Sequence, residues 1–360
     1  MLLLISLPIW VLLWSGLVSD DMTHYKHQKN RRSFMILCSL ALIVILGLRT
    51  ANTGSPDTYT YSVMFNGIKK YSNIVEYLSH LGILDKFFLF SEGGFYVFSW
   101  CVSQIFPSAQ WFILVTSAIV VLSTARFISK HSEDIVVSWI TFICLGSMTF
   151  AMNGMRQALA MSICLFAYDY AKEKKLFKFL LIVLLAVLFH KSAMMFALVY
   201  ILCNMKFNTK STAFLVAGVG VFLYFADRFA LLYDNVTGED YASGESFESG
   251  GLINVAIYIV AILGILIFSE RLKSPGGCPS FVLIVAGCAL YLARFVSAQI
   301  YERISYYFSY FLMLGFPIIF KDMKNKDRLI LRFCFIVCAI ALFAYRVSKG
   351  AFANFSLFFI

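Results

Sequence analysis

A few ionisable side chains stand inside or beside otherwise apolar stretches of this 360-residue chain. In the run FAMNGMRQALAMSICLFAY, at 150–168, Arg156 and Gln157 are the conspicuous polar pair. A charged group within a membrane is unfavourable and is a functional candidate by default. The arginines of this kind are Arg49, Arg156, Arg294 and Arg303. Because a guanidinium holds phosphate oxygens through two parallel hydrogen bonds, several arginines around one cavity predict a pyrophosphate site.

Two further residues could move a proton. His190 lies between two short apolar runs, and histidine is the usual general base near neutral pH. It is therefore the preferred base for an acceptor hydroxyl. Asp57 follows the turn Gly54-Ser55-Pro56 and is the second candidate, as base, as partner of His190 or as ligand of a sugar hydroxyl. The other expected substrate contacts in these regions are Gln157, Lys191, Tyr59, Tyr61 and Glu302.

Each of these residues also has a simpler explanation. A lone arginine near a helix end can extend to the lipid headgroups. His190 can be an ordinary hairpin-tip residue, and Asp57 can be a turn former after Pro56. The joint occurrence of several cations with a histidine and an aspartate at one membrane level favours a site. Their chemistry suits group transfer from a lipid-linked phosphate.

Other donors of the transferred group find less support in the sequence. It contains no DxD pair and no GxxxxGK[ST] loop, so neither a metal-held nucleotide sugar nor ATP is indicated. We therefore expect no cofactor and no metal site. The net charge of +10 could suggest nucleic acid, but its distribution along the chain does not.

The composition predicts that these residues are positioned by helices that lie in a bilayer. The chain is 60% hydrophobic and 14% charged, whereas soluble domains have about 25% charged residues. Apolar runs near the spanning length of ~20 residues recur throughout; they are 1–18, 34–48, 111–127, 176–189, 212–232, 252–268, 281–296 and 329–345. We expect an all-α integral membrane protein, a single transmembrane domain over 1–360 with about twelve (11–14) spanning helices. The first run lacks a basic flank and a cleavage site, so we expect a span rather than a signal peptide.

Lysine and arginine are concentrated in six short segments, which indicates how the chain is oriented. The segments are 19–33, 126–133, 172–178, 204–211, 270–275 and 321–332. Short basic loops stay in the cytoplasm, and about twelve spans allow all six to lie there with both termini outside. Segments 49–93 and 234–250 are then the larger outer loops. If segment 87–106 were a further span, the basic segments could not all lie on one side, so it is expected to be re-entrant or surface-lying.

The nine cysteines are expected to be small buried hydrophobic residues. Almost all of them lie within apolar runs, and none forms a CxxC pair. A disulfide framework or a zinc site is not indicated by this spacing.

The chain resembles the EpsG-like branch of the Wzy-type polysaccharide polymerases over about 49–308. The most specific block is RQALAMSICLFAYDYAKEKK followed by LFKFLLIVLLAVLFHKSAMM, in which Arg-Gln opens a helix and Phe-His-Lys-Ser-Ala follows the next one. LRTANTGSPDTYTYSVMF is similar to the family's Arg, Gly, Asp and aromatic pattern. Glu92-Gly93-Gly94-Phe95 resembles its Glu-x-Gly-aromatic element, which adds Glu92 to the substrate-binding candidates. The stretch starting at Arg303 is similar to its late Arg-aromatic element.

The resemblance implies an enzyme of the bacterial inner membrane whose site faces the outside. It would move a growing glycan from undecaprenyl pyrophosphate to the terminal sugar of a new lipid-linked repeat unit, and a one-step displacement would invert the anomeric centre. A GT-C-like architecture is compatible with it. The expected partners are the two lipid-linked repeat units, membrane lipids and a chain-length regulator, and no nucleic acid. Other lipid-pyrophosphate glycosyltransferases, such as an O-antigen ligase, and a lipid-linked oligosaccharide flippase remain alternatives.

Overall fold

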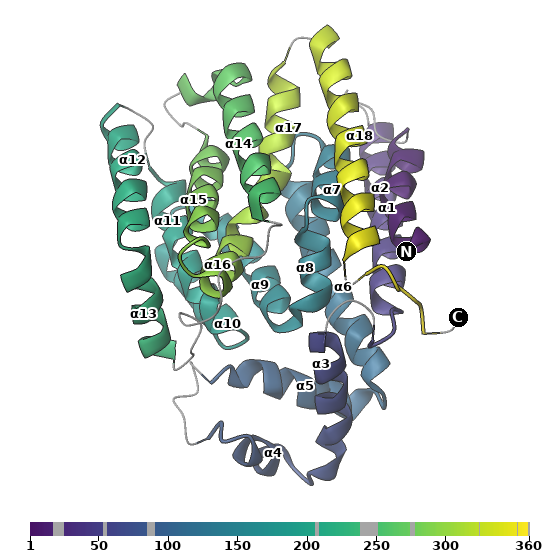
Figure 1. Ribbon diagram of the computed structural model, residues 1–360. Helices are drawn as coiled ribbons and strands as arrows, with labels where there is room; N and C mark the ends of the chain where they lie inside the picture. Colours follow the sequence, from purple (N-terminus) through teal and green to yellow (C-terminus); the bar gives the residue numbers. More distant parts are fainter. Residues whose placement is uncertain are drawn as a thin grey trace.

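The computed structural model describes residues 1–16, 25–52, 56–84, 91–205, 209–237, 251–273, 278–323, 325–350 and 352–358. The described residues form helices and short connections, and their single β contact is an isolated bridge between Arg49 and Leu357. The all-α prediction is confirmed. Most helices run along one bundle axis, while the segment that carries α3, α4 and α5 projects beyond one end of the bundle (Figure 1).

The first half of the chain contains both long and short helices. In order they are α1 (Leu2–Ser15), α2 (Tyr25–Gly47), α3 (Pro56–Gly67), η1 (Ile68–Lys70), α4 (Ile74–His80), α5 (Gly93–Ile105), α6 (Ala109–His131), α7 (Ile135–Cys144), α8 (Ser147–Asn153) and α9 (Met155–Lys172). The second half continues with α10 (Leu176–Val187), η2 (Lys191–Ala197), α11 (Leu198–Cys203), α12 (Thr209–Tyr224), α13 (Ala226–Thr237), α14 (Gly251–Phe268), η3 (Glu270–Lys273), α15 (Pro279–Ala293), α16 (Ala298–Ser309), α17 (Leu312–Asp322) and α18 (Asn325–Lys349).

Four helical stretches are long and apolar enough to cross a membrane. They are Asn30–Gly47 in α2, the whole of α6 and of α14, and Asp327–Lys349 in α18. The number rises to six if the bent pairs α7–α8 and α16–α17 each count as one span. The expected number of about twelve is not confirmed. Several apolar runs, including those of α1, α10 and α15, form helices of 10–17 residues, which are shorter than the ~20 residues that a span needs.

The chain from α7 to α9 forms the centre of the bundle. Every residue of α7 is buried. Asp134 caps this helix, since its Oδ1 accepts hydrogen bonds from the backbone N–H groups of Val136 and Val137 at 3.0 and 3.1 Å. The helix axis turns by 49° between α7 and α8. Gly146 at this bend has a φ of +106°, which residues with a Cβ rarely adopt.

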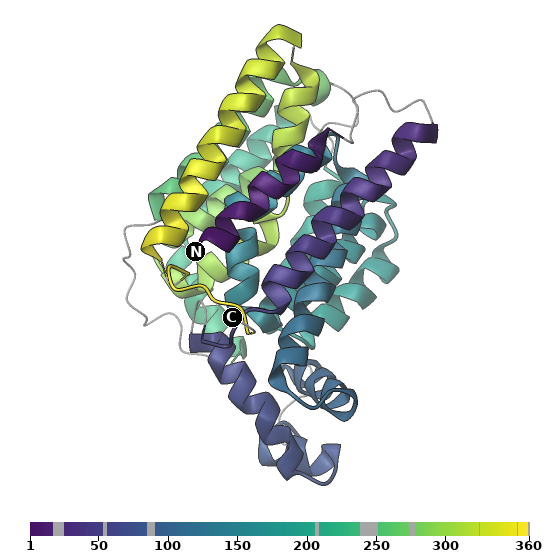
Figure 2. The same cartoon turned by 90° about the vertical axis from the view of Figure 1, so that its right-hand side faces the viewer.

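The described part of the predicted outer loop 49–93 contains the short helices α3, η1 and α4, and α5 follows them. α3 begins at Pro56 and has Asp57 in its first turn, a residue order that favours a helix start. α5 has 13 residues and lies across the bundle axis, as Figures 1 and 2 show together. It is too short to cross a bilayer, and whether segment 87–106 is re-entrant or surface-lying stays a prediction. Residues 53–55, 85–90 and 238–250 of the predicted loops and of segment 87–106 lie outside the described residues.

Candidate functional site

The described parts of the six basic segments gather at one end of the bundle, called the basic end from here on (Figure 1). Hydrogen bonds and ion pairs hold these segments and their neighbours together. The hydrogen bonds join Arg31 Nη2 to Ser129 O (3.0 Å) and Asn204 Nδ2 to Ala171 O (2.9 Å). The ion pairs join Lys130 Nζ to Asp169 Oδ2 (2.9 Å), Arg271 Nη1 to Glu133 Oε1 (2.9 Å), Arg271 Nη2 to Asp322 Oδ1 (3.0 Å) and Arg332 Nε to Asp134 Oδ2 (2.8 Å). The prediction that the short basic segments share one side of the molecule therefore agrees with the fold. The candidate site residues lie toward the opposite end.

Predicted site residues from three separate segments meet at the carboxylate of Glu92. Arg156 Nη1 lies 2.5 Å from Glu92 Oε2, and His190 Nδ1 bonds to Glu92 Oε1. The backbone N–H of Lys191 donates to the same Oε1 at 3.2 Å. Glu92 is only 5% exposed and His190 only 7%. These residues, Glu92, Arg156, His190 and Lys191, are called the Glu92 cluster.

The cluster keeps the buried carboxylate of Glu92 charged. Burial alone would raise its pKa, but the charge and hydrogen bond of His190 act in the opposite direction. With the charge of Arg156 and the N–H of Lys191, they lower the pKa of Glu92 from its usual 4.5 to about 2. An ionised carboxylate beside Nδ1 holds the imidazole proton there, which leaves Nε2 of His190 as the basic nitrogen.

The cluster forms because α5 begins close to the end of α10. A Cβ placed on Gly94 would lie 3.0 Å from the carbonyl oxygen and 3.1 Å from the carbonyl carbon of Leu188. Glycine at this position therefore permits an approach that a larger residue would oppose. Glu92 precedes α5 in a left-handed conformation with a φ of 57°, and His190 precedes η2 with an extended backbone.

Aromatic side chains surround the guanidinium of Arg156. Its Nε donates to the hydroxyl of Tyr61 at 3.2 Å. The rings of Tyr61 and Phe95 have their centroids 5.8 and 5.9 Å from its Cζ, a distance at which a cation is attracted to a ring. The side chain of Arg156 is 32% exposed, and its Nη2 makes no hydrogen bond to the described residues. This nitrogen remains available to an anionic ligand.

The start of α9 is bonded to α16. Gln157 Nε2 donates to the backbone oxygen of Arg303 at 2.5 Å. Close by in sequence, Phe150 stacks on Tyr306 with ring centroids 3.7 Å apart. Since Arg156 adjoins Gln157 and Glu302 adjoins Arg303, these contacts join the Glu92 cluster to a second group of polar residues around α16.

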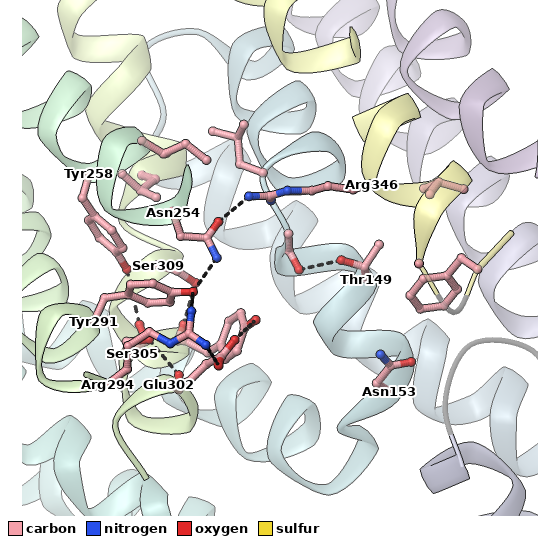
Figure 3. Close-up of a pocket in the computed structure, with 18 residues that line it drawn as sticks. Thr149, Asn153, Asn254, Tyr258, Tyr291, Arg294, Glu302, Ser305, Ser309 and Arg346 are labelled. Carbon is pink, nitrogen blue, oxygen red and sulfur yellow. Dashed lines mark hydrogen bonds and ion pairs between the residues drawn. The ribbon is translucent and has the colours of Figure 1, made fainter. Parts of the chain in front are cut away.

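That second group lines a cavity of about 430 Å³ (Figure 3). Arg294 Nη2 pairs with Glu302 Oε2 at 3.2 Å, and Arg294 Nη1 donates to the hydroxyl of Tyr291 at 3.1 Å. Uncharged polar side chains from α8 and α16 complete much of the wall; they are Thr149, Asn153, Ser305 and Ser309. Two arginines of different helices with several hydroxyl and amide groups suit a ligand that carries both phosphate and sugar.

The second arginine of the cavity is Arg346, which the sequence did not single out. Its Nη2 donates to Asn254 Oδ1 at 2.6 Å, and Asn254 Nδ2 donates in turn to the hydroxyl of Tyr291 at 2.7 Å. Arg346 belongs to the candidate span Asp327–Lys349 and pairs with no carboxylate among the described residues. The only sequence signal was its position directly after the apolar run 329–345, where an arginine also suits an ordinary helix end.

Arg49 is not brought to either group. It is 1% exposed, and its Nη2 donates to the backbone oxygen of Met152 at 2.9 Å while Nη1 bonds to the oxygen of Leu46 and, at 3.1 Å, to Ser117 Oγ. It thus satisfies carbonyl groups where α2 and α8 end, and it makes no hydrogen bond to the Glu92 cluster or to Arg294 or Arg346. The placement indicates a structural role.

Asp57 and Tyr59 are exposed on the first turns of α3. Between them, Thr58 Oγ1 donates to the oxygen of Met152 at 3.0 Å and so fastens α3 to α8. The carboxylate that bonds to His190 is that of Glu92 and not that of Asp57. Among the described residues no three His, Cys, Asp or Glu side chains could hold a metal ion, and six of the nine cysteines are buried.

Comparison with known proteins gives one match. No curated protein and no solved structure matches the chain significantly, so the GT-C-like architecture stays a prediction. The EpsG family model matches residues 32–359, a range that contains the Glu92 cluster and both cavity arginines. This match covers far more than half of the 360 residues, and the chain therefore belongs to the EpsG family.

Proposed function

We propose that this protein is a polysaccharide polymerase that transfers a growing glycan from undecaprenyl pyrophosphate to the terminal sugar of a lipid-linked repeat unit. Membership of the EpsG family suggests a membrane polymerase of the glycosyltransferase type. The observation that carries the reaction is the buried contact of His190 with the ionised Glu92. Such a pair is an activated base, and a buried base is expected in an enzyme that deprotonates a hydroxyl.

In the proposed step, Nε2 of His190 takes the proton of the acceptor hydroxyl. The freed oxygen attacks the anomeric carbon of the donor, and the bond from that carbon to the pyrophosphate breaks. Glu92 holds the imidazole through Nδ1 and stabilises the imidazolium that forms, as a carboxylate does in other histidine-dependent enzymes. The attack is from the face opposite the leaving group, so the anomeric configuration inverts.

We assign the leaving pyrophosphate to the cavity of Arg294 and Arg346. Negative charge grows on this group as its bond breaks, and fixed donors in a water-poor site stabilise it most at that point. Two further donors are Arg303, which follows the cavity residue Glu302 in the sequence, and the free Nη2 of Arg156. Arg49 remains a prediction with less support, because its guanidinium already bonds to backbone oxygens.

The sugar contacts follow from exposure and position. Tyr59 is exposed and can stack on a sugar ring, while Tyr61 and Glu302 hold Arg156 and Arg294. Gln157 and Lys191 contribute mainly through the bonds of Gln157 to α16 and of the Lys191 N–H to Glu92. Asp57 stays the second candidate for the base, at the exposed start of α3.

We place the Glu92 cluster outside the cytoplasm. Lysines and arginines of short loops stay in the cytoplasm, and the basic end is the opposite end of the bundle. A bacterial inner membrane with the reaction on its outer face fits this orientation. Membrane lipids and a chain-length regulator are then the expected neighbours.

The test is polymerisation with purified protein. Undecaprenyl-pyrophosphate-linked repeat units are incubated with the protein without nucleotide or added metal, and the products are separated on a gel. A ladder of glycans that differ by one repeat unit supports polymerase activity. Folded protein that gives no ladder but moves the lipid-linked unit across vesicle membranes would instead identify a flippase, and a single transfer to a different acceptor would identify a ligase.

The cavity has its own variant. Arg346→Gln keeps a donor for Asn254 but removes the cation, so the rate at low substrate should fall roughly 10- to 100-fold, the usual effect of losing a hydrogen bond to a charged group. Arg228→Gln removes an arginine that lies exposed on α13 and serves as the control. Equal rates for the two variants would contradict the assignment of the pyrophosphate to this cavity.

A further inference from the structure

A groove between α2 and α6 takes no part in the proposed reaction. The two helices are antiparallel and bonded near both ends, by Arg31 Nη2 to Ser129 O at 3.0 Å and by Gln110 Nε2 to Gly47 O at 2.7 Å. Toward the basic end the groove between them has a volume of about 660 Å³. Its lining joins three arginines to a largely apolar wall; the arginines are Arg31, Arg32 and Arg126.

The length of the groove corresponds to one leaflet of a bilayer. Its wall on α2 extends from Arg32 to Ile43, which is about 16 Å at 1.5 Å per residue. Half of a hydrocarbon core of ~30 Å is ~15 Å. Ile36 and Leu40 on α2 and Leu122 on α6 lie along this wall, and all three are about half exposed. An apolar chain that starts at the arginines would reach about the middle of the membrane.

Three guanidinium groups and no acidic residue line the charged end of the groove. Arg31 is attracted to Glu133 outside this lining, and Arg32 is exposed. Arg126 pairs through Nη2 with Asp169, but its Nη1 is buried and has no hydrogen-bond acceptor among the described residues. A buried donor without an acceptor is unfavourable, so the partly exposed side chain of Arg126 gains a hydrogen bond when it turns this nitrogen toward an anionic oxygen in the groove.

We propose that this groove binds a phospholipid with an anionic headgroup. The headgroup phosphate accepts hydrogen bonds from Arg126 and Arg32, and one acyl chain lies along Ile36, Leu40 and Leu122. The basic end indicates the leaflet, because short basic loops stay in the cytoplasm and the cytoplasmic leaflet attracts basic groups through its anionic lipids. The bound lipid bridges α2 and α6 and stabilises their packing, at the end of the molecule that is remote from the Glu92 cluster.

The experiment uses the full chain in detergent, washed free of lipid. Phosphatidylglycerol and phosphatidylcholine are titrated separately, and the midpoint of thermal unfolding is recorded. We expect phosphatidylglycerol to raise the midpoint at concentrations where phosphatidylcholine does not. Arg32→Gln should weaken this effect about fivefold, the contribution of one basic residue near an anionic membrane surface. Leu122→Trp fills the apolar part of the groove and keeps all three arginines. It should also weaken the stabilisation by phosphatidylglycerol.

Two controls identify what the groove recognises. Lys321→Gln removes an exposed positive charge at the basic end but outside the groove, and it should titrate as the wild type does. Inorganic phosphate and glycerophosphoglycerol carry the anion without a chain and should leave the midpoint unchanged. The lipid site is refuted if phosphatidylcholine or inorganic phosphate stabilises as well as phosphatidylglycerol does, or if Arg32→Gln and Leu122→Trp both titrate like the wild type. These measurements do not depend on polymer formation.

Discussion

The two ends of the bundle use arginine in different ways. At the basic end, Arg271 and Arg332 each pair with carboxylates, and their side chains keep about a third of their surface exposed. At the opposite end, Arg156 shares the buried Glu92 with His190. Arg346 faces a cavity there, and among the described residues it bonds only to an amide oxygen.

The difference separates anchoring from chemistry. A partly exposed ion pair contributes little free energy because water screens it, so the partly exposed pairs of the basic end mainly fix which loops lie together. A buried carboxylate that is held by a histidine and an arginine is costly to disrupt, and at Glu92 it has a strongly shifted pKa. The basic end also contains one such carboxylate, Asp169, which bonds to His131 and Arg126. Substitution of a partly exposed pair and substitution within the Glu92 cluster should therefore have effects of very different size.

The largest effect is expected for His190→Ala. Loss of a general base lowers a rate about 10²- to 10⁴-fold, so polymer formation at saturating substrate should fall by this amount. His80→Ala, on the exposed end of α4, is the matched control and should keep the wild-type rate. The measurement is the initial rate of ladder formation with equal amounts of folded protein. A rate within a few-fold of wild type would move the role of base to Asp57.

The second effect is a pH dependence of stability that comes from Glu92. Its pKa is lowered from 4.5 to about 2 in the folded protein. The stabilisation is therefore fully present above pH 4.5 and is lost as the pH falls toward 2. A shift of this size corresponds to about 3 kcal/mol. The wild type should unfold at higher temperature than Glu92→Gln at pH 6, and the gap should close on acidification; a gap that is the same at pH 6 and pH 3 would contradict the charged cluster.

Much of this arrangement could be predicted from the sequence because it depends on composition along the chain. Lipid-facing helices need apolar residues, so the class of fold followed from runs such as 252–268. The basic segments were expected on one side, and bonds such as that between Arg271 and Asp322 now join them. The likeness around Arg156 and His190 similarly selected residues that do meet, through Glu92.

The remaining features depend on distances that a single sequence does not contain. Glu92 and Arg156 are 64 positions apart, and their contact requires α5 to cross the end of the bundle. Arg49 and Arg346 look alike in sequence, since each follows an apolar run, yet one bonds to backbone oxygens and the other faces a cavity. The predicted number of about twelve spans is not confirmed, because several apolar runs form helices that are shorter than a span.

A smaller effect should follow from Gly94→Ala. The added Cβ would press on the backbone of Leu188, and overpacking of this kind costs about 1–3 kcal/mol. The start of α5 would move away from α10, so both the unfolding temperature and the rate should fall together. Gly67→Ala at the end of α3 adds the same methyl group where nothing lies within 4 Å and should change neither. Equal unfolding temperatures for the two variants would show that α5 does not hold the cluster.

The smallest effect is expected at the basic end, for Arg332→Gln. Arg332 pairs with Asp134, but its side chain is 29% exposed, and such pairs contribute about 0–1 kcal/mol. Asp134 would still cap α7 through its bonds to Val136 and Val137. The unfolding temperature should therefore change by only a few degrees, with polymer formation unaltered. If Arg332→Gln instead lowered polymer formation as much as Arg346→Gln does, with both proteins folded, the basic end would share in the reaction, and the separation of anchoring from chemistry would have to be given up.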